Sequence, residues 1–194
     1  MANEPTKIII GPVRFSYLNV FKPRFNEMNE KTEYSVTNLL PKSDKVSIDK
    51  IKEALKAALV AKFKAVPDKW DNPIRDGDKE TDNNGEAKYP GFWFFNTKSG
   101  EEYKPVTVNA SKQAVGPEAG WKSGDWGNVQ INCYGYEFKG KKGVGLGLLG
   151  IQFTKVDAGF GNTTDPAAVA AAFSGTGGDT PASTEDPTYD PFNE

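Results

Sequence analysis

The alternation of hydrophobic and polar positions is clearest over residues 121–156, where two alternating runs flank a turn rich in lysine and glycine. In the first run, Val129 and Ile131 alternate with polar residues, which is typical of a strand with one buried face. In the second run, valine and leucine alternate with Gly145 and Gly147, and glycines on one face let a barrel strand coil sharply. The pattern predicts one long β-hairpin.

The face of the first strand that points away from the aliphatic residues is polar and then aromatic, and the strand ends in lysines. Flat aromatic faces beside cations suit unstacked bases and phosphates. The hairpin residues that we expect to contact nucleic acid are Tyr134, Tyr136, Lys139, Lys141 and Lys142.

The first half of the chain predicts a second hairpin. Residues 7–21 predict a strand with a break at Gly11, and residues 34–40 predict its partner after a polar loop. Phe15 and Tyr17 share one face of the first strand by their spacing.

One helix is predicted over residues 48–65, because Ile48, Ile51 and Leu55 begin an apolar stripe at helical spacing, with Ser47 as the N-cap. The lysines of this segment lie opposite the stripe. Such a charge run is usually a solvated face, and contact with nucleic acid is the alternative.

The middle of the chain predicts a long surface loop over residues 67–90, in which Trp70 attaches the loop to the body. Residues 91–96 predict a short strand with aromatic side chains on both faces. Either both aromatic rows are covered, or one row is exposed for binding. Residues 104–108 predict another short strand.

The composition excludes several classes of protein. The chain has 194 residues, which suits one domain with a single core. No apolar run has the length of a membrane span, and the start of the chain does not fit a signal peptide, so we expect a cytosolic protein without membrane contact. Cys133 is the one cysteine and there is no histidine, so we expect no disulfide, no metal, no cofactor and no catalytic residues.

The net charge is only −2, but basic and acidic residues are unevenly distributed along the chain. All 24 basic residues lie before Asp157, together with 19 of the 26 acidic residues, whereas residues 157–194 hold the other 7 acidic residues. We therefore expect a basic domain over residues 1–156 and an acidic tail over residues 157–194. Within the tail, Asp165-Pro166 predicts a short helix over residues 166–173, and the composition from Ser174 onward is typical of disorder.

Two sequence motifs imitate ligand sites. Gly145, Gly147 and Gly150 fit the spacing of a dinucleotide-binding loop, but the residues that follow continue a strand where a helix is required. The acidic residues from Glu80 onward imitate half of a calcium loop, but Gly91 stands where a bidentate glutamate is required.

Four segments resemble a known family in their order and spacing: GPVRFSY at 11–17, YSVTNLLPKS at 34–43, SGD at 123–125, and GVGLGL at 143–148. With them, the chain resembles the phage-encoded single-stranded DNA-binding proteins of OB-fold type. The resemblance implies a mainly β, OB-fold-like antiparallel barrel with one main helix and a disordered acidic C-terminal tail. It implies a protein that coats single-stranded DNA without reading its sequence, in phage replication or recombination in the host cytoplasm.

The resemblance also implies that the tail contacts replication proteins such as a polymerase or helicase. The tail residues expected to do so are Glu185, Asp186, Tyr189, Asp190 and Phe192. The sequence is compatible with a monomer or a homodimer.

The favoured hypothesis is a sequence-independent binder in which aromatic rings stack on bases and basic residues follow the phosphates. The alternatives are a phage structural or scaffold-type protein, whose aromatic rows only pack against other subunits, and a nuclease. Beside the hairpin residues named above, the expected DNA-binding residues are Arg14, Tyr17, Lys22, Arg24, Lys42, Trp93 and Trp126.

Overall fold

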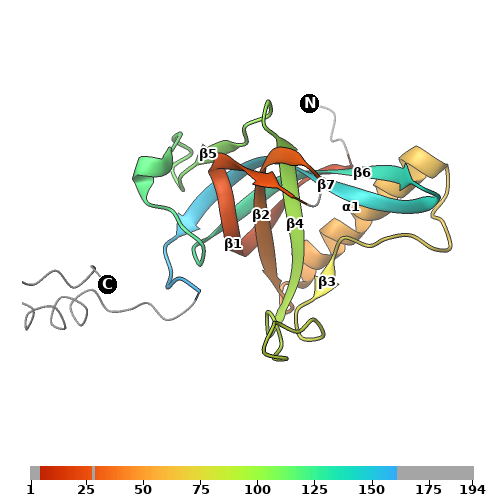
Figure 1. The fold of residues 1–194 in the computed structure, drawn as a ribbon, viewed down its shortest axis with the longest axis horizontal. Helices are drawn as coiled ribbons and strands as arrows, with labels where there is room; N and C mark the ends of the chain where they lie inside the picture. Colours follow the sequence, from red (N-terminus) through yellow and green to blue (C-terminus); the bar gives the residue numbers. More distant parts are fainter. Residues whose placement is uncertain (1–4, 28, 161–194) are drawn as a thin grey trace, which may run out of the picture. The chain divides into compact units, whose positions relative to one another are not determined.

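The computed structural model describes residues 5–27 and 29–160 (Figure 1). The acidic tail, with the predicted helix over residues 166–173, lies outside the described residues. The elements are β1 (Lys7–Asn26), β2 (Lys31–Pro41), α1 (Lys45–Phe63), β3 (Arg75–Asp76), β4 (Phe92–Gly100), β5 (Val106–Val108), a 3-10 turn (Pro117–Ala119), β6 (Trp126–Phe138) and β7 (Lys141–Lys155).

Five strands close into a barrel. Strands β4, β2, β1, β6 and β7 pair in that order, and a further pairing of β4 with β7 closes the ring. The closing pair is parallel, at Lys98 and Gly147, whereas the other pairs of the ring are antiparallel. A five-stranded barrel with one helix is the OB-like arrangement. The predicted fold class is thus confirmed.

The barrel core is apolar and includes several aromatic rings. Phe15, Phe95 and Phe153 are fully buried, and the Phe153 ring stacks on Trp121 with 4.6 Å between the ring centroids. The apolar stripe of α1 covers one end of this core through residues such as Leu59. The stripe predicted from helical spacing is therefore the buried face of the helix.

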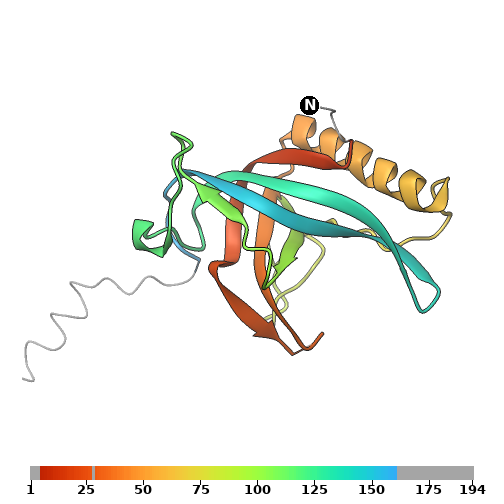
Figure 2. The same ribbon diagram turned by 90° about the horizontal axis from the view of Figure 1, so that it is seen from above.

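The predicted hairpin of β6 and β7 is confirmed, and its far part extends beyond the barrel beside α1 (Figure 2). Lys139 and Gly140 both have positive φ, so they make the tight two-residue turn that suits a twisted hairpin. Between Gln130 and Ile131 the register shifts, which leaves Leu149 as an additional, exposed residue of β7. This bulge bends the long strand around the barrel.

Two local predictions need correction. The helix begins at Lys45, and its N-cap is Asp44 rather than Ser47, because the Asp44 carboxylate accepts a hydrogen bond of 3.0 Å from the backbone N–H of Ser47. Tyr17 does not follow Phe15 into the core. The pairing of β1 with β2 shifts between Ser16 and Asn19, and Tyr17 has a φ of 48° and a side chain that is 64% exposed.

Cys133 is buried, and this burial raises the pKa of its thiol to about 12, so the thiol is not reactive at neutral pH. Among the described residues, no helix has the length and apolar character needed to cross a membrane.

Candidate nucleic-acid interface

A groove crosses the outer face of the β1–β2–β4 sheet, and we call it the central groove. It consists of two adjoining cavities of about 630 and 440 Å³, which share Tyr17, Lys88 and Tyr89. Because these residues line both cavities, the two form one track. The side chains that line the central groove include Arg14, Tyr17, Arg75, Lys88, Tyr89, Phe94, Asn96, Lys98 and Phe160.

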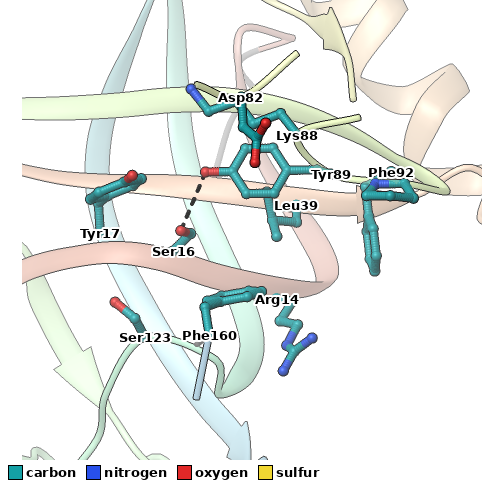
Figure 3. A pocket seen from close by; sticks show the side chains of 11 residues that line it. Arg14, Ser16, Tyr17, Leu39, Asp82, Lys88, Tyr89, Phe92, Ser123 and Phe160 are labelled. Atoms are coloured by element: carbon teal, nitrogen blue, oxygen red, sulfur yellow. Dashed lines mark hydrogen bonds between the residues drawn. The ribbon is translucent and has the colours of Figure 1, made fainter. Parts of the chain in front are cut away.

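Two tyrosines stand in the middle of the central groove (Figure 3). Tyr17 is mostly exposed because the backbone shift in β1 turns it outward. The Tyr89 ring lies on Phe94, with 5.1 Å between ring centroids, and its hydroxyl is 3.4 Å from the Ser16 hydroxyl. Burial raises the pKa of Tyr89, so its ring is neutral at physiological pH. The groove thus offers aromatic surface to an unstacked base.

Strand β4 does not offer an open aromatic row of its own. Phe95 lies in the barrel core, and Phe94, on the opposite face, is only 1% exposed. Phe94 is covered by Tyr89 and by two cations: the Arg75 guanidinium lies 4.8 Å from its ring centroid and the Lys88 ammonium 5.8 Å. The aromatic ring that covers Phe94 and lines the central groove here is therefore that of Tyr89.

The sequence reasoning missed Arg75, Lys88 and Tyr89, because they lie in the segment that was predicted only as a surface loop. That segment folds back onto β4: Arg75 pairs with Phe94 as part of β3, and the backbone N–H of Tyr89 donates to the carbonyl of Gly77. A signal was present in the sequence, since Lys88 and Tyr89 directly precede the aromatic strand and continue its mixture of basic and aromatic residues.

Arg14 lies at one end of the central groove and is held in place by the protein itself. Its guanidinium donates to the carbonyls of Gly124, at 2.9 Å, and Ala158, at 2.6 Å, and lies 4.3 Å from the Phe160 ring centroid. Phe160 also lines the groove at this end. The guanidinium is therefore stacked on a ring and turned toward the chain that follows β7.

Trp126 is hydrogen-bonded to the same segment, the chain that follows β7. Its indole N–H donates to the Asp157 carboxylate at 2.7 Å, and this hydrogen bond lowers the pKa of Asp157. The ring lies 6.2 Å from that of Phe92, which lines the groove. Trp126 thus lies beside the groove, with its polar atom already bonded.

Lys42 and Trp93 do not line the central groove. The Lys42 ammonium lies 4.7 Å from the Trp93 ring centroid and forms ion pairs with Asp76 and Asp78. Hydrogen bonds to these carboxylates raise the pKa of Lys42, and they lower the pKa of each carboxyl. Lys42 and Trp93 therefore help to join the loop to β4, and the charge of the Lys42 ammonium is balanced by two carboxylates.

Lys22 and Arg24 are exposed on the outer half of β1. Arg24 lines a third cavity of about 400 Å³, which shares Asn26 and Ser35 with the central groove. Beside Arg24 lies Phe25, whose ring is exposed and was not among the expected residues. These residues lie apart from Arg14 and form a flanking basic and aromatic surface.

Five expected residues lie together on the far part of the β6–β7 hairpin, which we call the hairpin platform: Tyr134, Tyr136, Lys139, Lys141 and Lys142. Tyr134 is 51% exposed, and Lys139 and Lys141 are exposed at the turn. Lys142 is directed elsewhere, because its ammonium lies 5.0 Å from the Phe63 ring centroid.

The central groove and the hairpin platform meet where β4 pairs with β7. Lys98, on the groove side, is the register partner of Gly147, which lies next to the Tyr134 ring. Glu33 accepts a hydrogen bond of 2.6 Å from Lys98, and although burial opposes it, hydrogen bonds from Asn26, Lys98 and Asn29 lower the pKa of Glu33. The outer surface thus continues from one aromatic region to the other through a polar junction.

The chain matches a family model described as the single-stranded DNA-binding protein of Enterobacter phage Enc34, over residues 6–179. The chain belongs to this family. The match covers the whole described barrel, and the family is defined by binding of single-stranded DNA rather than by a reaction, in agreement with the expectation that the protein is not an enzyme. The resemblance to phage single-stranded DNA-binding proteins is confirmed.

Solved structures of related phage proteins have the same fold. The Enc34 single-stranded DNA-binding protein in complex with single-stranded DNA is 24% identical, with a TM-score of 0.68 over 81% of this chain and 91% of that chain. Its C-terminal truncation is 25% identical, with a TM-score of 0.66 over 81% and 90%. Gp2.5 of bacteriophage T7, also a single-stranded DNA-binding protein, is 18% identical, with a TM-score of 0.55 over 85% and 93%. No curated protein matches the chain.

Proposed function

We propose that this protein binds single-stranded DNA without sequence preference, in the replication or recombination of a phage genome in the host cytoplasm. The observation that carries the proposal is the central groove, where Tyr17 and Tyr89 line the same cavity as the basic side chains of Arg75 and Lys88 in a chain of the Enc34 family. A structure of the Enc34 protein contains single-stranded DNA, which supports the same ligand here.

The groove chemistry favours single strands over duplexes. Every base has a π-face, so stacking on Tyr17 and Tyr89 is tolerant of sequence, but the bases of a duplex are already stacked on one another. The cations along the groove supply the second contribution, because each neutralised phosphate releases bound counterions. Stacking and counterion release together predict tight binding to single strands with a strong dependence on salt.

The DNA path that we propose runs along the central groove and continues across the junction at Lys98 to the hairpin platform. The polar surface at the junction includes Asn96, whose side-chain oxygen accepts a hydrogen bond of 2.7 Å from Thr37. The platform then adds Tyr134, Tyr136 and the exposed turn lysines to the path.

A titration of the full-length protein with oligo-dT, followed by tryptophan fluorescence at two salt concentrations, tests the proposal. The expected result is tight binding that weakens steeply with salt, and much weaker binding to a duplex of equal length. Equal affinity for duplex, or no binding to oligo-dT at low salt, would contradict the proposal and favour a structural or scaffold-type protein.

The proposal extends to the acidic tail, which lies outside the described residues. Its 7 carboxylates form a polyanion tethered to a basic body, so the tail can compete with DNA for the cations of the central groove. DNA in the groove would then release Tyr189 and Phe192 for contact with a polymerase or helicase. Domain 1–156 would bind DNA, and residues 157–194 would recruit partners.

A further inference from the structure

Two tyrosine rings of the hairpin platform lie over glycines of the opposite strand. Tyr134 is the register partner of Gly145, and Tyr136 is the register partner of Gly143. A Cβ atom at Gly145 would be 2.4 Å from Cζ of Tyr134, and a Cβ atom at Gly143 would be 2.6 Å from Cζ of Tyr136. Both distances are too short for any side chain, so each ring occupies the space that a side chain at the glycine would need.

Backbone geometry does not require glycine at these positions. Gly143 and Gly145 both lie outside the residues with positive φ, in contrast to Gly140 in the turn. Glycine also weakens a strand, because it loses more conformational freedom on folding and has no side chain to pack. The positions of the two rings therefore account for the two glycines, and a left-handed backbone conformation does not.

The strands below the rings are held firmly on their other sides. Gly135 lies so close to α1 that a Cβ atom there would be 2.6 Å from Cβ of Lys62. Along the edge of β7, the backbone N–H of Asp71 donates to the carbonyl of Lys142 at 2.8 Å, and the N–H of Val144 donates to the carbonyl of Asp71 at 3.4 Å. The backbone that carries the rings is therefore fixed before any ligand arrives.

We propose that Gly143 and Gly145 are positioning residues, which let the rings of Tyr136 and Tyr134 lie against β7 with an outer surface open to a DNA base. This inference rests on the proposed function. Tyr134 is supported from below yet remains 51% exposed, as a stacking surface requires. A ring that is already oriented loses little freedom when a base stacks on it, so more of the stacking energy remains as affinity.

The Gly145→Ala variant tests this role, with Gly147→Ala as a matched control on the same face of the same strand. The nearest heavy atom to a Cβ atom at Gly147 is 3.5 Å away, which is an ordinary contact, so the control displaces no ring. In the full-length protein, Gly145→Ala should weaken oligo-dT binding by about 5- to 150-fold, the range for loss of one stacked base. Gly147→Ala lies at the junction but displaces no ring, so it should reduce the affinity much less than Gly145→Ala does.

A second pair of variants separates ring position from other effects of the substitution. In a Tyr134→Ala background there is no ring to displace, so adding Gly145→Ala should cause no further loss of affinity. If the loss of affinity in the double variant equalled the sum of the losses in the two single variants, the proposal would be overturned. Alanine at position 145 would then act independently of the Tyr134 ring.

Tyr134→Leu tests the ring without changing either glycine. Leucine covers Gly145 but offers no aromatic face, so the thermal midpoint should remain near that of the parent while the affinity falls. Unchanged affinity in Tyr134→Leu would mean that the ring only covers the glycine, and would overturn the proposal.

Titration of the parent protein in the same series separates the proposed binding of single-stranded DNA from the positioning role of the glycines. If the parent fails to bind oligo-dT, the proposed function fails. If the parent binds and Gly145→Ala binds as tightly as Gly147→Ala, the positioning role alone fails.

Discussion

The ammonium of Lys42 donates a hydrogen bond of 2.6 Å to the carboxylate of Asp78. Asp76 accepts a second hydrogen bond from the same ammonium, so one cation is shared by two anions. Asp78 also accepts from the backbone N–H of Gly91 at 2.7 Å, just before β4 begins. The cluster fixes the loop against the sheet and leaves the neighbourhood of Lys42 without excess positive charge.

We predict that Lys42→Met lowers thermal stability but changes the salt dependence of DNA binding much less than Lys141→Met does. Lys42 is neutralised by its partners, whereas Lys141 is exposed beside a turn. Melting curves and oligo-dT titrations of both variants check this. If the salt dependence of oligo-dT affinity decreased more in Lys42→Met than in Lys141→Met, DNA would have to displace the two carboxylates from Lys42.

The same cluster predicts a dependence of stability on pH. The hydrogen bonds from Lys42 lower the pKa values of Asp76 and Asp78 in the folded state. Their contribution is therefore present above the ordinary aspartate pKa of about 4 and is lost as the pH falls through the lowered values. The difference in melting temperature between the parent and Lys42→Met should accordingly shrink on acidification, and a constant difference would argue against the ion pairs.

Tyr17→Ala should weaken oligo-dT binding by on the order of 1–3 kcal/mol, the contribution of one stacked base. Because the Tyr17 ring is mostly exposed, the melting temperature should change little. Tyr103→Ala is the matched control, since Tyr103 is also a mostly exposed tyrosine but does not line the central groove or the cavity beside it. Equal losses in both variants would move the DNA path away from the central groove.

The alternation pattern predicted the long strands well because these strands have one buried face, and the barrel itself was implied by the family resemblance. Val129 and Ile131 are fully buried at the alternate positions that the pattern indicates, and the glycine-lysine turn lies where expected. Which aromatic rings line the central groove was not predictable in the same way. Alternation assigns Tyr17 to the face of Phe15, and only the register shift in β1, set by pairing with β2, turns it outward.

The loop residues were missed for a different reason. Arg75 reaches Phe94 only because β3 folds back onto β4, a contact that no local pattern encodes. Lys88 and Tyr89 directly precede the aromatic strand, but only the fold of the loop shows that they cover Phe94. Lys42 shows the converse. A lysine that follows a strand resembles a phosphate ligand. Whether its charge is free to bind phosphate depends here on Asp76 and Asp78, which follow Lys42 by 34 and 36 residues.

Removal of residues 174–194 should tighten oligo-dT binding, most clearly at low salt. The deletion removes Asp179, Glu185, Asp186, Asp190 and Glu194 and leaves the basic body intact. A segment tethered to the same chain has a roughly millimolar effective concentration at its binding site, so even weak binding of the tail would compete with DNA. Identical affinities of the full-length and truncated proteins at low salt would show that the tail does not compete with DNA and serves only the solubility of the protein.

Phe160→Ala should also tighten oligo-dT binding, by several-fold, because Phe160 occupies the Arg14 end of the central groove. With the ring present, the Arg14 guanidinium is stacked on Phe160 and bonded to the carbonyl of Ala158, so DNA must displace this segment to reach the cation. Val156→Ala is the matched control, since Val156 is exposed near the same end of the chain and does not line the groove. The deciding quantity is the sign of the change relative to this control. Weaker binding in Phe160→Ala would mean that the ring stacks on a base, and Arg14 with Phe160 would then extend the DNA path instead of obstructing it.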